Sequence, residues 1–248
     1  LATMTSSYVE KRTVGTGELG PKRRKLYFFG AALSEDPSSA FSKTLEAIGF
    51  TTVPRAIPAD DAEEFGSRLS ECLRDGDMPV IAGKSHMTAE GFSAFAGAVE
   101  AAGMLWLSPY ASITRTLSGS DALGRLLRAG EGPGIIPHIG DVDRGYVAPG
   151  VDNLVLVGLR EADRDESEII RTLGIPVFTM EDVDQTGIQG VMRRALQRAV
   201  VGTRGLYVYF DERLSDNGQE GLTTRETHMM MELIARSGFM RALDRKST

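Results

Sequence analysis

The residues best placed for chemistry are a carboxylate and a guanidinium two positions apart, Asp211 and Arg213, directly after the apolar run 205–210. Side chains two apart at the end of a strand point to the same side, so we expect Asp211 and Arg213 to contact each other. The pair is either a local ion pair or the remnant of a site that held two carboxylates.

A second stretch, His138-Ile-Gly-Asp141-Val-Asp143, could in principle offer three ligands to a cation. It lies in the Gly/Pro-rich connection 130–150, where alternating aspartates are more typical of turns than of metal sites. The glycines of Gly15-Thr-Gly17-Glu-Leu-Gly20 have the spacing of a dinucleotide fingerprint. However, Pro21 and a basic run follow where a helix should begin, which argues against a nucleotide site.

The histidines and the cysteine do not complete a catalytic arrangement. His86, His138 and His228 are isolated in the sequence, and no Gly-x-Ser-x-Gly nucleophile motif accompanies them. Cys72 lies beside the apolar stripe of a predicted helix, so we expect a partly buried structural thiol. If Cys72 were exposed, the only disulfide it could form would be between chains.

Composition describes an ordinary globular chain. Apolar residues make up 42% and charged residues 25% of the 248 residues, which suits one domain over 1–248. The net charge of -6 argues against general nucleic-acid binding, and the basic cluster 22–25 fits a solvated loop. We find no run long enough to span a membrane and no signal-peptide core, and the single cysteine fits a reducing compartment. We therefore expect a cytoplasmic location.

Short apolar runs alternate with helical patterns along the chain. This alternation predicts an α/β fold, a three-layer α/β/α sandwich around a mostly parallel sheet. The expected strands are Leu26–Gly30, Pro79–Ala82, Met104–Leu107, Leu154–Gly158, Val177–Thr179 and Gly205–Phe210. The expected helices are Ala59–Arg74, Thr88–Ala102, Glu166–Leu173, Gly187–Val201 and Thr223–Arg236. In such sheets functional residues gather at the carboxyl ends of the strands, here after Ala82, Leu107, Gly158 and Phe210.

Several segments resemble the arginase (ureohydrolase) family in order and spacing. They are Val80–Gly83, Leu105–Leu107, Asn153–Asp163, Thr172–Met180, Val183–Ile188, Tyr209–Asp211 and Gly221–Glu226. The similarity covers most of residues 78–244, whereas residues 1–77 match only loosely. The resemblance implies the arginase-like fold and a homo-oligomer, commonly a trimer and in some members a hexamer.

The resemblance also implies which residues correspond to the metal ligands. An active arginase holds two Mn²⁺ ions with aspartates and histidines, and a metal-bridging hydroxide attacks the guanidinium carbon of arginine. The six corresponding positions here are Ser85, Ser108, Tyr110, Ser112, Asp211 and Arg213, so five of the six ligands are replaced. His86 could substitute for Ser85 only through a one-residue shift, which would turn its side chain to the other face. We therefore expect no metal cofactor and no catalytic residue.

Three substrate-side positions correspond more closely. Glu226 matches a carboxylate that pairs with the substrate guanidinium, Asp163 one that helps to hold its amino group, and Ser118 a serine near its carboxylate. Each has a structural alternative: Thr223-Thr-Arg-Glu226 also forms a capping box, and Asp163 precedes a helix.

Three functions follow as hypotheses. The leading one is an arginase-like pseudoenzyme with a binding, regulatory or scaffolding role, whose small-molecule ligand is unknown. The second is a divergent metal-dependent ureohydrolase acting on arginine or another guanidino compound. The third is a metal-independent sensor of arginine or ornithine.

Overall fold

The computed structural model describes residues 25–29, 51–54, 62–82, 86–113, 122–128, 149–215 and 221–246. Within these residues the chain forms an eight-stranded sheet in the order β2-β1-β3-β8-β7-β4-β5-β6, and all neighbouring strands are parallel. The strands are β1 (Lys25–Phe29), β2 (Thr51–Pro54), β3 (Met78–Ala82), β4 (Ala102–Leu107), β5 (Leu154–Leu159), β6 (Val177–Thr179), β7 (Gly205–Asp211) and β8 (Met240–Lys246).

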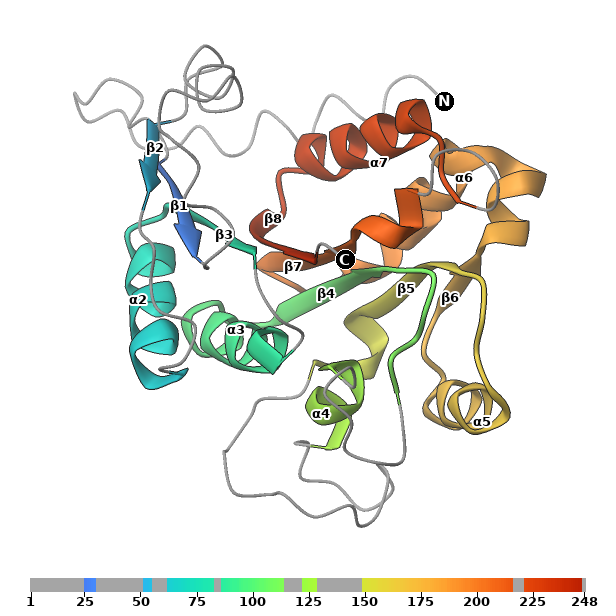
Figure 1. Cartoon of the computed structure of the whole chain (residues 1–248), viewed down its shortest axis with the longest axis horizontal. Coiled ribbons are helices and arrows are strands. Elements are labelled where there is room, and N and C mark those ends of the chain that lie inside the picture. The colour runs from blue at the N-terminus through green and yellow to red at the C-terminus, as the bar shows by residue number, and fades with distance from the viewer. Residues whose placement is uncertain are drawn as a thin grey trace.

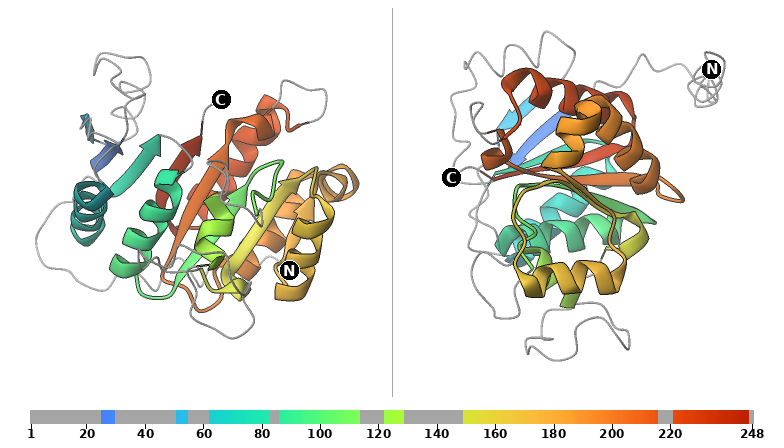
Figure 2. Two further views of the ribbon diagram at one scale, coloured as in Figure 1. Left: turned by 60° about the horizontal axis from the view of Figure 1, so that its bottom comes forward. Right: turned by 90° about the vertical axis from the view of Figure 1, so that its right-hand side faces the viewer.

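Helices cover both faces of this sheet (Figures 1 and 2). They are α2 (Ala62–Arg74), α3 (His86–Ala98), α4 (Ala122–Arg128), α5 (Arg164–Leu173), α6 (Met180–Ala199) and α7 (Thr224–Arg236). Helices α2 to α5 pack on one face around Trp106 and Tyr207, and α6 and α7 pack on the other around Leu105 and Val208. The predicted three-layer α/β/α sandwich is therefore confirmed.

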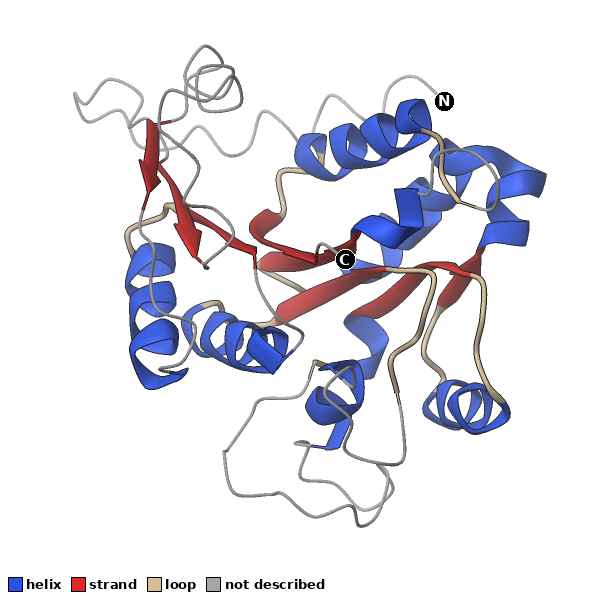
Figure 3. Ribbon diagram, in the orientation of Figure 1, coloured by secondary structure: helices blue, strands red, loops and turns tan. Residues whose placement is uncertain are grey.

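All six predicted strands are present in the structure, with small differences at their ends (Figure 3). The central strands β4 and β5 are buried on both faces, as their continuous apolar runs predict. Of the helices, α6 differs most from the prediction because it begins at Met180 instead of Gly187. Thr179 and Asp182 form a capping box there, and Gly187, with φ 71° and ψ 155°, kinks the helix at the predicted start.

Among the strands and α-helices of the described residues, β2, α4 and β8 were not predicted. The most consequential is β8, which lies in the middle of the sheet between β3 and β7. Its sequence Met-Arg-Ala-Leu-Asp-Arg-Lys carries four charges and does not show the apolar pattern of a buried strand. Two of those charged residues, Asp244 and Lys246, are nevertheless buried.

No helix among the described residues combines the length and apolar character that crossing a membrane requires. The glycine motif 15–20, residues 22–24 of the basic cluster and the connection 130–148 lie outside the described residues, whereas Lys25 of that cluster begins β1 and is exposed.

Candidate functional site

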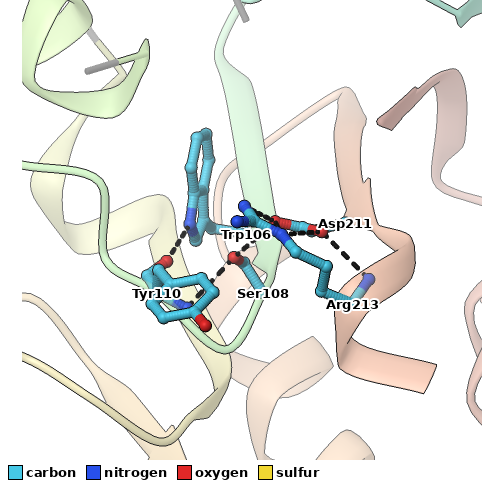
Figure 4. A network of polar contacts seen from close by, with 5 residues as sticks. All are labelled: Trp106, Ser108, Tyr110, Asp211 and Arg213. Carbon is cyan, nitrogen blue, oxygen red and sulfur yellow. Dashed lines mark hydrogen bonds and ion pairs between the residues drawn. The ribbon is translucent and has the colours of Figure 1, made fainter. Parts of the chain in front are cut away.

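The candidate site lies where β4 and β7 end side by side in the sheet. Leu107 of β4 pairs with Phe210 of β7, so Ser108 and Asp211 follow at the same edge. Both residues are buried, at 1% and 2% exposure. Figure 4 shows that Tyr110 and Arg213 converge on the same place, so four of the six predicted site positions meet here.

Asp211 is held by the guanidinium of Arg213 on both of its carboxylate oxygens. Arg213 Nη2 donates to Asp211 Oδ2 at 2.6 Å, and Arg213 Nε lies 3.0 Å from Oδ1 and 3.1 Å from Oδ2. The backbone N–H of Arg213 also donates to Oδ1, at 3.0 Å. The predicted contact between the two residues is confirmed. Its cause differs from the prediction, because Arg213 lies on a 3₁₀ helix, Glu212–Ser215, and not on an extended strand.

The pair is buried at one end and open at the other. The Asp211 side chain is 3% exposed and the Arg213 side chain 47% exposed. The hydrogen bonds and the charge of Asp211 raise the pKa of Arg213 above its ordinary value, against the effect of partial burial. Arg213 is therefore a permanent cation, and the pair carries no net charge.

Ser108 connects this pair to the loop after β4. Its hydroxyl donates to Asp211 Oδ2 at 3.3 Å and accepts the backbone N–H of Tyr110 at 3.1 Å. Its own N–H donates to the carbonyl of Val157 on β5. Ser108 thus fixes both the carboxylate and the path of the loop.

The ring of Tyr110 lies beneath the guanidinium, with Arg213 Cζ 4.6 Å from the ring centroid. The Tyr110 carbonyl accepts a hydrogen bond from Trp106 Nε1 at 2.9 Å. Trp106 in turn stacks flat on Tyr209, with 3.7 Å between the ring centroids. Burial, with the nearby charges of Asp244 and Asp211, raises the pKa of Tyr209, so this phenol stays neutral. The stacked rings of Trp106 and Tyr209 therefore support the loop that carries Tyr110.

The 3₁₀ helix Glu212–Ser215 is anchored by the two residues that follow Arg213. Leu214 is fully buried and packs against Gly158 on β5. Gly158 has a φ of 85°, and a Cβ there would lie 2.4 Å from Leu214 Cδ1, so only glycine fits. The hydroxyls of Ser215 and Thr227 also bond at 2.9 Å, which ties this turn to α7.

Ser112 does not share the contacts of this site. It has a positive φ of 54°, and its carbonyl accepts the N–H of Gly124 on α4. The neighbouring Ile113 N–H donates to Glu166 on α5. The chain around Ser112 therefore connects to α4 and α5. Ser85 and Ser118 lie outside the described residues.

Asp163 and Glu226 both serve as capping residues. Asp163 is the N-cap of α5 and accepts the N–H of Glu166 at 2.7 Å. Glu226 accepts from the N–H and the hydroxyl of Thr223, the N-cap of α7, at 2.9 and 2.7 Å. Their predicted structural alternatives, helix cap and capping box, are thus present in the structure.

A second polar cluster, which we did not predict, lies on the same face of the sheet. Asp244 on β8 is fully buried, and its Oδ2 accepts from Thr88 at 2.7 Å and from Tyr207 at 3.0 Å. Its Oδ1 forms an ion pair with Lys246 at 2.8 Å, without the alignment of a hydrogen bond. Lys246 pairs in register with Asp211 across β7 and β8, so the two clusters are neighbours. In the sequence, the charged residues of β8 are the feature that could have indicated this cluster.

The described residues at this edge do not fit a pair of manganese ions. Asp211 is the one carboxylate in the Ser108–Arg213 cluster, and its oxygens are engaged by a cation. Across the part of the chain that the structure describes, no group of three histidine, cysteine, aspartate or glutamate side chains is arranged to hold a metal. The side chain of His86 and residues 138–143 lie outside that part.

Comparison with known proteins gives a consistent family assignment. The model of the "Arginase family" matches residues 44–244. The chain is 27% identical over 191 residues to an arginase of Bacillus caldovelox, which covers 71% of this chain and 63% of that protein. It therefore spans less than two thirds of that relative's length.

Solved structures agree on the fold. The crystal structure of arginase from Bacillus cereus matches with a TM-score of 0.74 at 20% identity, over 91% of each chain. The native structure of Bacillus caldovelox arginase matches with a TM-score of 0.71 at 20% identity, over 90% of each chain.

These matches overturn one prediction. We expected no metal cofactor, and this expectation is wrong, because the family that the matches identify is one of binuclear manganese enzymes. Since the family model covers residues 44–244 of 248, the chain belongs to the arginase family.

Proposed function

We propose that this chain is a non-hydrolytic member of the arginase family, a pseudoenzyme whose β4–β7 edge serves binding or regulation. The observation that carries the proposal is the bidentate contact of Arg213 with Asp211. A carboxylate whose two oxygens already accept from a guanidinium, a hydroxyl and a backbone N–H has few lone pairs left for a nucleophile or a metal ion. In this state Asp211 is not available for hydrolysis.

Charge supports the same proposal. A site that attracts the cationic guanidinium of arginine needs net negative charge, since opposite charges about 4 Å apart attract by about 4 kcal/mol at an effective dielectric near 20. The Asp211–Arg213 pair is neutral, and half of the Arg213 side chain faces solvent. A substrate guanidinium would therefore approach a neutral pair whose exposed end is a cation. The replacement of family ligands at Ser85, Ser108, Tyr110 and Ser112 remains part of this proposal.

The second candidate is a divergent manganese-dependent ureohydrolase acting on arginine or another guanidino compound. The 27% identity to an arginase favours it. The third candidate, an arginine or ornithine sensor using Glu226, Asp163 and Ser118, has weaker support. Glu226 and Asp163 already have capping partners that account for their positions.

Urea release separates the first two candidates. We would incubate purified protein, loaded with added Mn²⁺, with arginine, agmatine or guanidino acids, and compare it with the matched variant Asp211→Asn. We expect neither protein to release urea above a heat-inactivated blank. Turnover by the native chain that is lost in Asp211→Asn would overturn the proposal and establish the hydrolase.

We also propose that the chain forms a homo-oligomer, a trimer or hexamer, and works in the cytoplasm. Membership of the arginase family supports the first statement, and the single buried cysteine supports the second. Sedimentation equilibrium tests the oligomer: we expect three or six times the 26.8 kDa chain mass, and a monomer would contradict it.

A further inference from the structure

The contacts around Arg213 have the form of a ligand-binding site in which the ligand is part of the chain. The guanidinium donates to both oxygens of the Asp211 carboxylate and lies over the aromatic ring of Tyr110. We infer that Ser108, Tyr110 and Asp211 form a guanidinium-binding site, and that Arg213 occupies it as an internal ligand and so excludes external guanidino compounds.

The geometry selects a guanidinium over an ammonium group. A planar guanidinium presents parallel N–H donors that match both oxygens of a carboxylate, and its flat face stacks on an aromatic ring. In Arg213, Nε and Nη2 donate to Asp211, and Cζ lies over the Tyr110 ring, 4.6 Å from its centroid. A lysine or a simple amine would make one point contact and would lose the second hydrogen bond.

The guanidinium-binding site is held together by contacts that do not involve the Arg213 side chain. Asp211 is also held by the Ser108 hydroxyl and by a backbone N–H, which any residue at position 213 supplies. The backbone of Tyr110 is held by the Ser108 hydroxyl and by the indole N–H of Trp106, which stacks on Tyr209. Removing the guanidinium should therefore leave a preformed site with a buried carboxylate that lacks its cation.

Arg213 can leave the site without a change of fold. Its side chain is 47% exposed, whereas the next residue, Leu214, is fully buried and holds the backbone in place. An external ligand competes with a tethered one, and tethering gives an effective concentration of about millimolar or higher. The native chain should therefore bind small guanidino compounds poorly. A variant without the side chain should bind them about tenfold more tightly or better.

The test measures binding of methylguanidinium, at millimolar concentration, to the variant Arg213→Ala. Methylammonium at the same ionic strength is the comparison. Isothermal titration calorimetry gives Kd, and the melting temperature gives an independent measure of binding. We expect saturable binding of methylguanidinium to Arg213→Ala, at least about tenfold tighter than to the native chain, and a rise in Tm. Methylammonium should bind more weakly to the same variant.

Two further variants complete the design. The double variant Asp211→Asn/Arg213→Ala should lose the response, because the carboxylate is gone. Arg236→Ala removes an exposed arginine from the Arg236–Glu232 pair and should bind methylguanidinium as poorly as the native chain does. If Arg213→Ala does not fold, Arg213→Lys keeps the charge with a single contact and should also bind methylguanidinium more tightly than the native chain.

Failure to bind methylguanidinium, equal binding of methylammonium, or a response that survives loss of Asp211 would each overturn the inference. The inference rests on the proposed function in one respect, namely that Arg213 closes the site in the resting protein. Urea release from the same native preparation keeps the two apart: hydrolysis would sink the proposed function, whereas failure of Arg213→Ala to bind methylguanidinium would sink only the internal-ligand inference.

Discussion

Replacing Lys246 with methionine should destabilise the fold far more than an average lysine substitution. Its ammonium lies 2.8 Å from Asp244 Oδ1, and the two side chains are 8% and 0% exposed. The other oxygen of Asp244 already accepts from Thr88 and Tyr207, so loss of the ammonium leaves Oδ1 buried beside an apolar chain. Removal of one partner from a buried ion pair costs about 3–5 kcal/mol, and we expect Lys246→Met to fall in this range.

The pairwise origin of this cost can be checked with a second substitution. Asp244→Asn removes the charge but keeps an oxygen for Thr88 and Tyr207. The double variant Asp244→Asn/Lys246→Met should therefore lose only about 1–3 kcal/mol, less than the single variant. Denaturant unfolding followed by circular dichroism measures these differences, with exposed Lys25→Met as the control, expected within about 0.5 kcal/mol of the native chain. A Lys246→Met variant as stable as this control, or a double variant less stable than Lys246→Met, would refute the reasoning.

Three further outcomes follow from the structure. Gly158→Ala should lower the free energy of unfolding by about 1–3 kcal/mol because of its positive φ, and by about 1–3 kcal/mol more because of the clash with Leu214. Gly174→Ala has a positive φ but no neighbour within 4 Å, so denaturant unfolding should show only the loss of about 1–3 kcal/mol that the positive φ causes. Burial and the charge of Asp244 raise the pKa of Tyr207 above its ordinary 10.0, so the folded state keeps a proton that the unfolded chain loses. The contribution of Tyr207 to the free energy of unfolding should therefore be fully present below about pH 10 and be lost above it. The free energy of unfolding of Tyr207→Phe should fall less steeply above about pH 10 than that of the native chain, and equal slopes would contradict this. Burial also raises the pKa of Cys72 to about 12, so a thiol reagent should modify the native chain much more slowly than the unfolded chain at neutral pH.

Strand and helix patterns predict most of the sheet because the central strands are apolar throughout. Leu154–Val157 can be recognised as a strand buried on both faces from its sequence alone. β8 cannot be recognised in this way, since Asp244 and Lys246 look like solvent-exposed residues. Their burial depends on mutual charge compensation and on Thr88 and Tyr207, which are distant in sequence. Long-range pairing of this kind leaves no local pattern.

At the candidate site, too, the sequence predicts local contacts but not those between distant residues. The spacing of Asp211 and Arg213 correctly predicts their contact, although the chain leaves the strand and forms a 3₁₀ turn between them. The position of Tyr110 beneath the guanidinium depends on the loop after β4, which Ser108 and Trp106 hold through contacts that no spacing rule contains. The expectation of no metal cofactor failed for another reason. It relied on aligned side chains alone, whereas the family assignment points to a manganese-dependent family.

Whether Arg213 closes the site is tested by the coupling energy between Asp211 and Arg213, measured with a double-mutant cycle of Asp211→Asn and Arg213→Ala. The Arg236–Glu232 pair on α7 is a matched control, because its closest contact is also 2.6 Å but both of its side chains are more than half exposed. We expect a coupling energy of about 1.5–3 kcal/mol for Asp211–Arg213 and about 0.3–0.5 kcal/mol for the control. A coupling at Asp211 no larger than that of the control would contradict the claim that Arg213 closes this site.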